Sequence, residues 1–215
     1  TISNVAVTQN SAFSTGNGVT GYSAPGSYDK NYSYAGGIAG LNEADAVIEH
    51  CFVNVCVNGY YFIGGITGAN RGTIRECAFT GGANHVVNNT KGIGYVGGIA
   101  GTGYTLRNSI SAATITGEGE GLGSIAGTVA NEGEVKNNRF VNDEIDGIDN
   151  INYTGVADKV SYEEIMSLEQ IPDGFKRVTV TFKADGQIVT EKTVAYNGSL
   201  TETELPPIPE KDGYY

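Results

Sequence analysis

Gly64-Gly65-Ile66-Thr67-Gly68 is one of four copies of a short motif that decides the fold. The other copies are Gly36-Gly37-Ile38-Ala39-Gly40, Gly97-Gly98-Ile99-Ala100-Gly101 and Gly123-Ser124-Ile125-Ala126-Gly127. They begin at residues 36, 64, 97 and 123, so successive starts lie 28, 33 and 26 residues apart. Recurrence at this spacing indicates a protein built from structural repeats.

A second element follows each motif and completes the repeating unit. The four second elements are Val47–Phe52, Thr73–Phe79, Thr105–Ser109 and Glu134–Phe140. Each unit contains two or three runs of strand length, without helical periodicity, and cannot bury a core alone. The sequence therefore predicts an all-β fold, a right-handed parallel β-solenoid of about four or five coils in which the motif isoleucines align. We expect the motif glycines to adopt positive φ at coil corners and to let adjacent coils approach closely.

Cys51 and Cys77 occupy the same position of successive units, which Ser109 and Asn138 continue. On adjacent coils the two cysteines would lie about 4.8 Å apart. We favour a column of small, reduced, buried side chains, and a disulfide between the two is the alternative. Cys56 has no partner in this register.

The units resemble the GLUG repeat, whose pattern is roughly G-G-[IL]-[AV]-G-x-N-x-G-x-[IV]-x-N-C-[YF]. Gly64 to Phe79 matches nearly throughout, and the resemblance covers about residues 34–145, although the third unit lacks the Asn-x-Gly and the Cys. GLUG repeats are known from bacterial surface proteins, including adhesin-like molecules and non-catalytic regions of immunoglobulin-A-specific metallopeptidases. The resemblance implies an extracellular location on a bacterial cell surface.

The ends of the repeat region are set by composition and by partial repeats. Ile2–Val7 resembles the second element of a unit, so we expect residues 1–33 to form the entry to the solenoid. We also expect residue 1 to lie within a longer solenoid rather than at its natural start. Of 32 glycines, 28 lie in residues 1–157, whereas four of five prolines follow. We therefore expect a solenoid over residues 1–157, a helical linker or cap over 158–175 and a separate module over 176–215.

The C-terminal part has its own local signals. Ser161-Tyr162-Glu163-Glu164 is a capping-box sequence that predicts a helix of about two turns, which would cover the last coil of the solenoid. Val178–Lys183 alternates apolar and polar residues, Asp185-Gly186 supplies a turn, and Ile188–Val194 predicts the second strand of an antiparallel hairpin.

The order of segments in this part resembles the Listeria–Bacteroides repeat, also called the internalin B-repeat. The matching segments are Val180-Thr181-Phe182, Val194-Ala195-Tyr196-Asn197-Gly198-Ser199-Leu200, Pro206 to Pro209 and Gly213-Tyr214. The resemblance implies a small β-grasp-like module and again a bacterial surface protein. Because the family usually continues through a further strand, we expect the module to be truncated or ill-ordered at Tyr215.

Charge and motif content argue against several classes of function. The net charge is −11, all of it arising in residues 111–215, so we expect no nucleic-acid partner. No stretch approaches the roughly 18 apolar residues of a transmembrane helix, so no membrane insertion is expected. Two G-x-G-x-x-G strings, at 16–21 and 92–97, do not open a helix, and His50 and His85 are too few for His-ligated zinc. We expect no cofactor and no metal.

The acidic residues keep one enzymatic alternative open, because enzymes that degrade polysaccharides use a pair of carboxyl groups for catalysis. Residues 118–173 contain 13 acidic and 3 basic residues, yet no acidic position recurs from unit to unit. We interpret Glu118, Glu120, Glu132 and Glu134 as a solvated rim. Asp143, Asp146 and Asp149 could offer oxygens to Ca²⁺ but do not follow the EF-hand spacing.

Thirteen tyrosines in 215 residues suggest where a binding surface would lie. Seven of them lie near or within the glycine motifs: Tyr28, Tyr32, Tyr34, Tyr60, Tyr61, Tyr95 and Tyr104. Exposed aromatic rings stack on sugars or anchor protein partners, and core packing is the alternative.

Together these features predict a non-enzymatic fragment of a bacterial surface protein with adhesin-like binding of a host extracellular protein or glycan. No catalytic, cofactor or metal residue is assigned, and the ligand-binding residues are unknown. A passive stalk displaying another domain and a β-helix polysaccharide-degrading enzyme are the alternatives.

Overall fold

The structure is a computed structural model that describes residues 1–8, 18–20, 33–89, 94–117, 120–130, 134–149, 155–195 and 198–207. Strands dominate it, and within these ranges α1 (Tyr162–Ser167) is the one α-helix. The described helices are too short and too polar to cross a membrane. The all-β prediction is confirmed, and most strands run parallel to their partners.

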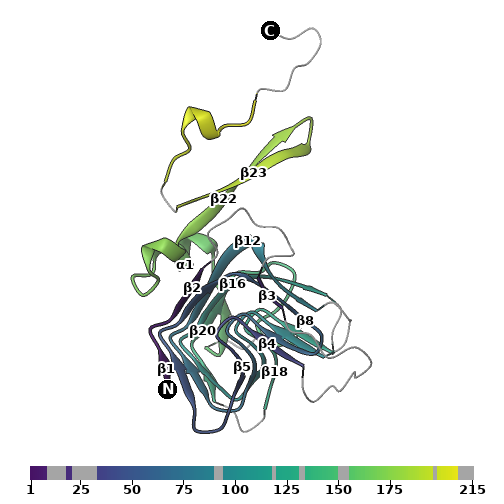
Figure 1. The fold of residues 1–215 in the computed structure, drawn as a ribbon, viewed down its shortest axis with the longest axis vertical. Helices are drawn as coiled ribbons and strands as arrows, with labels where there is room; N and C mark the ends of the chain where they lie inside the picture. Colours follow the sequence, from purple (N-terminus) through teal and green to yellow (C-terminus); the bar gives the residue numbers. More distant parts are fainter. Residues whose placement is uncertain are drawn as a thin grey trace.

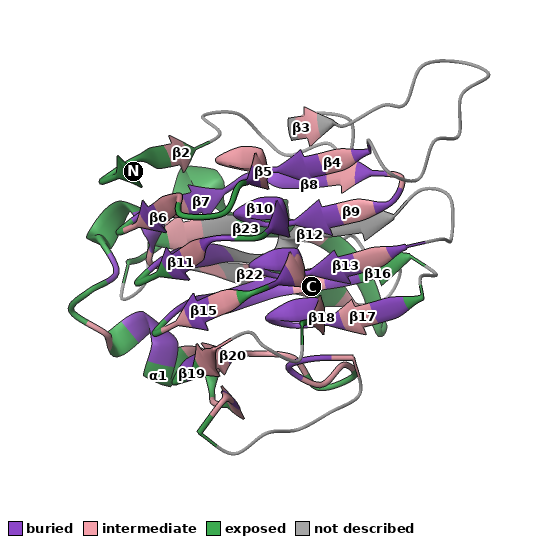
Figure 2. Ribbon diagram, turned by 90° about the horizontal axis from the view of Figure 1, so that it is seen from below, coloured by how far each residue is buried: buried purple, intermediate pink, exposed green. Residues whose placement is uncertain are grey.

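One turn of the chain passes through four parallel sheets. The second complete turn shows the order: β9 (Phe62–Gly64), β10 (Thr67–Asn70), β11 (Thr73–Arg75) and β12 (Ala78–Asn89). Each of these strands pairs in parallel with the equivalent strands of the turns before and after it, so the four sheets are named here the β9, β10, β11 and β12 sheets. We call each such turn a coil. Figure 1 shows the coils nearly superposed, and Figure 2 shows their strands in layers.

The remaining strands fill these sheets in chain order. The β9 sheet holds β4 (Tyr34–Gly36), β13 (Tyr95–Gly97) and β17 (Gly121–Gly123), and the β10 sheet holds β5 (Ala39–Asn42), β14 (Ala100–Gly103) and β18 (Ala126–Val129). The β11 sheet holds β1 (Ile2–Ser3), β6 (Val47–Glu49), β15 (Thr105–Arg107) and β19 (Val135–Lys136). The β12 sheet holds β2 (Ala6–Thr8), β3 (Gly18–Thr20), β7 (Phe52–Asn54), β8 (Cys56–Gly59), β16 (Ile110–Gly117), β20 (Asn138–Phe140) and β21 (Ala157–Lys159).

The register of these sheets aligns the motifs of successive units. Gly64 pairs with Gly36 on one side and Gly97 on the other, and Thr67 pairs with Ala39 and Ala100. The alignment predicted from the repeats is therefore confirmed. The expectation for Ile2–Val7 is also confirmed, because β1 pairs with β6 and β2 pairs with β7. A complete coil contributes a strand to each of four sheets rather than the predicted two or three strands.

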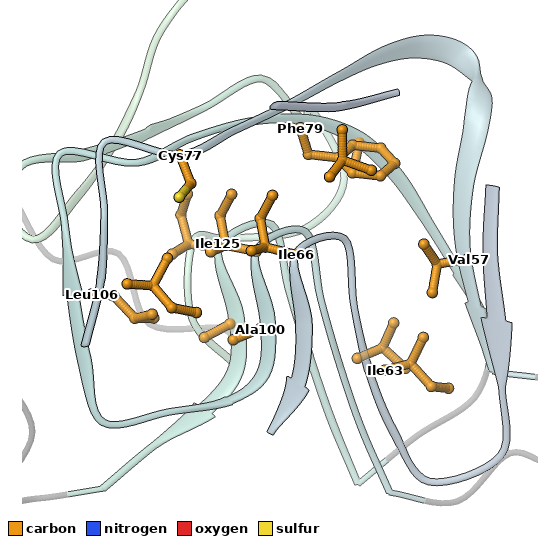
Figure 3. Packing of buried hydrophobic residues seen from close by; sticks show 14 of the residues in the cluster. Val57, Ile63, Ile66, Cys77, Phe79, Ala100, Leu106 and Ile125 are labelled. Atoms are coloured by element: carbon orange, nitrogen blue, oxygen red, sulfur yellow. The ribbon is translucent and has the colours of Figure 1, made fainter. Parts of the chain in front are cut away.

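The Gly-Gly-Ile turn folds inward and divides the interior. The chain reverses between the β9 and β10 sheets, and Ile66, Ile99 and Ile125 at the tips of successive turns have no exposed surface. In Figure 3, Ile66 and Ile125 lie in a row at these tips. Val57 and Ile63 lie on one side of the turn, and Ala100 and Leu106 lie on the other. One hydrophobic core surrounds the turn.

The last glycine of the motif lets the β9 and β10 sheets pass back to back. A Cβ added at Gly101 would lie 2.6 Å from the Ile63 nitrogen and 2.6 Å from the Gly68 oxygen, both of them backbone atoms. The expected close approach is thus present. The expected positive φ is wrong, because the described glycines with positive φ are Gly94, Gly117, Gly155 and Gly186, none of them in a motif.

Positive φ is found instead in a column of non-glycine residues at the corner between the β11 and β12 sheets. The column consists of Asn4, His50, Glu76, Asn108 and Asn137, with φ of 57°, 50°, 54°, 51° and 54°. The left-handed region is unfavourable for L-residues, and asparagine tolerates it best. His50 is therefore a corner residue, just outside strand β6.

At the four corners from His50 to Asn137 the next residue is buried, and these residues form a column of Cys51, Cys77, Ser109 and Asn138. The Cys77 N–H donates to Ser109 Oγ at 3.4 Å, and the Ser109 N–H donates to Asn138 Oδ1 at 3.0 Å. All three cysteines are buried thiols that are not joined by a disulfide in the structure. A hydrogen bond to Cys51, together with burial, raises the pKa of the Cys77 thiol, so it remains protonated.

Helix α1 begins where the sequence predicts, because the Glu164 N–H donates to Ser161 Oγ at 3.1 Å. Its position differs from the prediction. Ile165 and Met166 pack with Ala78 and Ile110, which lie on β12 and β16, so α1 covers the side of the stack rather than its last coil. The physical reason is an apolar outer face on the β12 sheet, to which Phe52 also contributes through a tilted ring contact with Phe175 of the 3₁₀ helix Asp173–Phe175.

The predicted hairpin is confirmed. Strands β22 (Arg177–Ala184) and β23 (Gln187–Ala195) pair antiparallel. Asp185 and Gly186 have φ of 49° and 81°, the two positive values that a tight two-residue hairpin turn requires. A 3₁₀ helix, Glu202–Glu204, follows the hairpin.

Candidate functional site

The seven tyrosines that the sequence suggested for a binding surface differ in location and exposure. Tyr28 and Tyr32 lie outside the described residues. Tyr61 is buried, and Tyr60 is half-buried. Tyr34 and Tyr95 lie in strands of the β9 sheet, and Tyr104 is 38% exposed at a corner of the stack. The surface-forming candidates are therefore Tyr34, Tyr95 and Tyr104.

Tyr34, Phe62 and Tyr95 form an aromatic column on the β9 sheet. They occupy paired positions of three successive coils. The ring centroids of Tyr34 and Phe62 are 5.2 Å apart and those of Phe62 and Tyr95 are 5.9 Å apart, with interplanar angles of 20° and 16°. Such stacking stabilises neighbouring coils. A hydrogen bond to Glu120, with partial desolvation, raises the pKa of the Tyr95 hydroxyl.

A groove of about 760 Å³ runs across the corner between the β10 and β11 sheets. Four successive coils contribute to it, each through the connection that leaves the β10 sheet. We call it the corner groove. Its lining residues are Ala44, Asp45, Asn70, Arg71, Gly72, Thr73, Thr102, Gly103, Tyr104, Thr105, Thr128, Val129 and Ala130.

Buried asparagines hold two of these connections in place. Asn42 and Asn70 pair in register, and Asn42 Nδ2 donates to Asn70 Oδ1 at 2.7 Å. Asn70 Nδ2 in turn donates to the Gly72 and Thr105 oxygens at 3.2 and 3.1 Å. Because the asparagine side chains satisfy backbone groups of their own and the next coil, the floor of the groove is fixed before any ligand arrives.

Tyr104 enters the groove because the third repeat departs from the pattern of the second. Thr73 pairs with Thr105, so Gly72 and Tyr104, which precede them, hold equivalent positions on adjacent coils. The second unit has Asn70-Arg71-Gly72 there, whereas the third has the shorter Gly103-Tyr104. A tyrosine thus replaces the glycine of the repeat and presents its ring beside a position without a side chain.

Charged groups in the corner groove are few and mostly paired. The Arg71 guanidinium contacts the Glu43 carboxylate at 3.3 Å, and both side chains are exposed. Asp45 adds one carboxylate to the lining, and its backbone is in the left-handed region with φ of 65°. Hydroxyl groups are more frequent, and they come in pairs on adjacent coils: Thr73 with Thr105, and Thr102 with Thr128.

The acidic residues of the sequence analysis do not converge in the described part of the chain. Glu134 pairs with Arg107 and Lys136, and Asp143 pairs with Lys159 at 2.9 Å, which lowers the pKa of Asp143. Glu118 and Glu132 lie outside the described residues.

Metal-ligating side chains are also dispersed. Among the described residues, no group of three His, Cys, Asp or Glu side chains could hold a metal ion, and Asp143, Asp146 and Asp149 form no such group. His50 Nε2 lies 2.9 Å from Glu76 Oε2, on adjacent coils of the positive-φ column. The His85 side chain lies outside the described part of the structure.

Comparison with known proteins yields a distant structural likeness. No family model matches the chain, and no curated protein matches it. A crystal structure of a putative immunoglobulin A1 protease from Bacteroides ovatus is similar, with 22% sequence identity and a TM-score of 0.44. The match covers 69% of this chain and 57% of that one, so this chain spans little more than half of that protein's length. A likeness of this degree carries no conclusion about activity.

Proposed function

We propose that this chain is a non-enzymatic, adhesin-like part of a bacterial cell-surface protein, which binds a host extracellular protein or glycan through its coils. In this proposal residues 1–157 are a right-handed parallel β-solenoid of GLUG-type units. Residues 158–175 link them to a β-grasp-like module of the Listeria–Bacteroides type over 176–215. The parallel pairing of equivalent strands in successive units supports the solenoid, and the repeat resemblance supports the extracellular location.

The corner groove carries the proposal of binding. A groove of about 760 Å³ is of the size that small-molecule and oligomer sites occupy. It combines an exposed ring, Tyr104, with hydroxyl, amide and charged groups, and its floor is fixed by the Asn42–Asn70 hydrogen bond. A rigid floor lowers the entropic cost of binding, because the protein is not ordered by the ligand.

Binding of the purified chain to an array of host matrix proteins, mucins and glycans tests the proposal. We expect a saturable signal that is lost in Tyr104→Ala and retained in Val189→Ala, which removes an exposed apolar group from the hairpin instead. Circular dichroism and thermal unfolding of both variants control for folding.

Two outcomes of the same experiment contradict the proposal. A blank array from a folded sample favours a passive stalk that displays another domain. Release of shortened glycan during incubation, measured by mass spectrometry, favours the polysaccharide-degrading enzyme.

A further inference from the structure

We infer that the corner groove binds a linear, uncharged polysaccharide whose chain lies parallel to the axis along which the coils stack. This inference rests on the proposed binding function and names its ligand class. The structural basis is the juxtaposition of one exposed tyrosine ring with threonine hydroxyls that repeat from coil to coil in a groove of nearly balanced charge.

The period of the groove points to a polymer. Parallel strands on adjacent coils lie about 4.8 Å apart, so the four coils that line the groove span roughly 14 Å. An extended chain of β-linked pyranose rings advances by nearly the same distance per ring. A ligand with this repeat places one ring beside each successive coil, which a compact small molecule does not do.

The side chains offer the chemistry that sugars require. The Thr73–Thr105 and Thr102–Thr128 pairs place hydroxyls on adjacent coils, and each hydroxyl both donates and accepts hydrogen bonds. Tyr104, which is 38% exposed, supplies an aromatic face for the C–H groups of one ring. The hydroxyls fix the chain laterally, and the ring fixes its position along the groove.

Charge selects against acidic polysaccharides. The guanidinium of Arg71 is neutralised by Glu43, so Asp45 leaves a net negative charge at the groove. The chain as a whole also carries −11. Both effects repel an anionic polymer, and a neutral ligand avoids them. Binding should therefore change little with ionic strength, in contrast to sites that pair opposite charges.

Isothermal titration calorimetry with the full chain tests the inference. The probes are β-1,4-linked oligomers of glucose, mannose and N-acetylglucosamine with two to six units, and galacturonate oligomers of the same lengths serve as anionic counterparts. We expect affinity for at least one neutral series to rise about tenfold, or about 1.4 kcal/mol, between two and four units and then to level off. The anionic series should bind more weakly at every length.

Variants of the lining residues locate the site and distinguish the contribution of the Tyr104 ring from that of the threonine hydroxyls. We expect Tyr104→Ala to abolish the length-dependent gain and Tyr104→Phe to retain most of it, because phenylalanine keeps the aromatic face. Thr102→Val with Thr128→Val removes two hydroxyls at nearly constant volume and should weaken binding of the four-unit oligomer. Val189→Ala should leave all affinities unchanged.

The inference and the proposed function fail in different ways. A Tyr104-dependent array signal from a protein, a branched glycan or an anionic glycan, without length-dependent binding of the neutral oligomers, overturns the linear polysaccharide and preserves adhesin-like binding. Affinity that is equal for all lengths, or unaffected by Tyr104→Ala, also overturns it. A blank array together with no heat of binding to any oligomer overturns both.

Discussion

The stacked coils and the β22–β23 hairpin use similar apolar residues to opposite effect. In the coils, Ile66, Ile99 and Ile125 are fully buried by strands that lie a whole coil away in the sequence. In the hairpin, each strand pairs with its neighbour in sequence, and Ile188 and Val189 remain 60% and 46% exposed. A strand pattern alone therefore does not reveal how much a residue stabilises the fold. What decides it is whether another layer covers the strand.

The comparison predicts that changes in the coils will affect the free energy of unfolding far more than similar changes in the C-terminal part. Four substitutions, each with a matched control, test this difference. Each is measured by urea unfolding monitored by circular dichroism, with midpoint and slope compared to the unmodified chain.

Gly101→Ala should have the largest effect. The added Cβ meets backbone atoms of Gly68, Ile63 and Tyr95 within 2.8 Å, so whole strands must move apart. We expect a loss of about 3 kcal/mol or more. Gly174→Ala is the matched control, because a Cβ there has no neighbour within 4 Å, and it should be nearly neutral. Equal stability of the two variants would show that the β9 and β10 sheets do not pass back to back.

Ile99→Ala should cost about 2–5 kcal/mol, because it leaves a cavity at the tip of an inward turn where the side chain has no exposed surface. Ile188→Ala removes the same atoms from the exposed hairpin and should change stability by less than about 0.5 kcal/mol. If the hairpin variant lost as much as the coil variant, a further layer would have to cover the hairpin.

Asn70→Ala should cost about 1–3 kcal/mol, because it removes the acceptor of Asn42 and leaves the Gly72 and Thr105 oxygens without this donor. It should also weaken ligand binding at the corner groove, since the floor is no longer fixed. Asn138 is also a buried, hydrogen-bonded asparagine but does not line the groove, so Asn138→Ala serves as the comparison for ligand binding. Unchanged stability of Asn70→Ala would mean that water takes over the hydrogen bonds made by the Asn70 side chain.

Glu76→Asn should have the smallest effect and the opposite sign. Asparagine tolerates the φ of 54° better than glutamate, and relief of this backbone strain should add up to about 1 kcal/mol. The lost contact with His50 is half-exposed and worth little. Glu76→Gln removes the charge but keeps the backbone preference, so it should not be stabilised. Destabilisation of Glu76→Asn beyond that of Glu76→Gln would contradict the strain.

Sequence reasoning reached what depends on recurrence and on local turns. Equivalent motifs revealed the alignment of Gly36, Gly64 and Gly97, and Asp185-Gly186 revealed the hairpin. It missed the inward reversal at Gly-Gly-Ile, because that turn depends on close packing between backbones of two sheets rather than on a glycine at positive φ. The asparagines that recur at the positive-φ corner could have predicted its left-handed backbone, but His50 and Glu76 occupy the same position in other units and obscured the pattern.

The candidate site was harder to predict for a physical reason. Tyr61 and Tyr104 both stand beside a glycine motif, yet Tyr61 is buried and Tyr104 is exposed. Their neighbours come from adjacent coils, so only the three-dimensional register distinguishes them. The missing Asn-x-Gly of the third unit was the available indication that this corner differs from its counterparts.

The corners of the coil differ in how freely their length can change. The Gly-Gly-Ile reversal keeps one length, since residues 37–38, 65–66, 98–99 and 124–125 each join a strand of the β9 sheet to one of the β10 sheet. The connections at the corner groove vary, from residues 43–46 to 71–72 to residue 104 alone. At this corner, changes in length lie on the outside of the stack, where they alter the walls of the groove without moving the Gly-Gly-Ile turn. A chain built in this way can acquire new recognition loops while its scaffold stays constant, which makes the corner groove the natural place to redesign specificity.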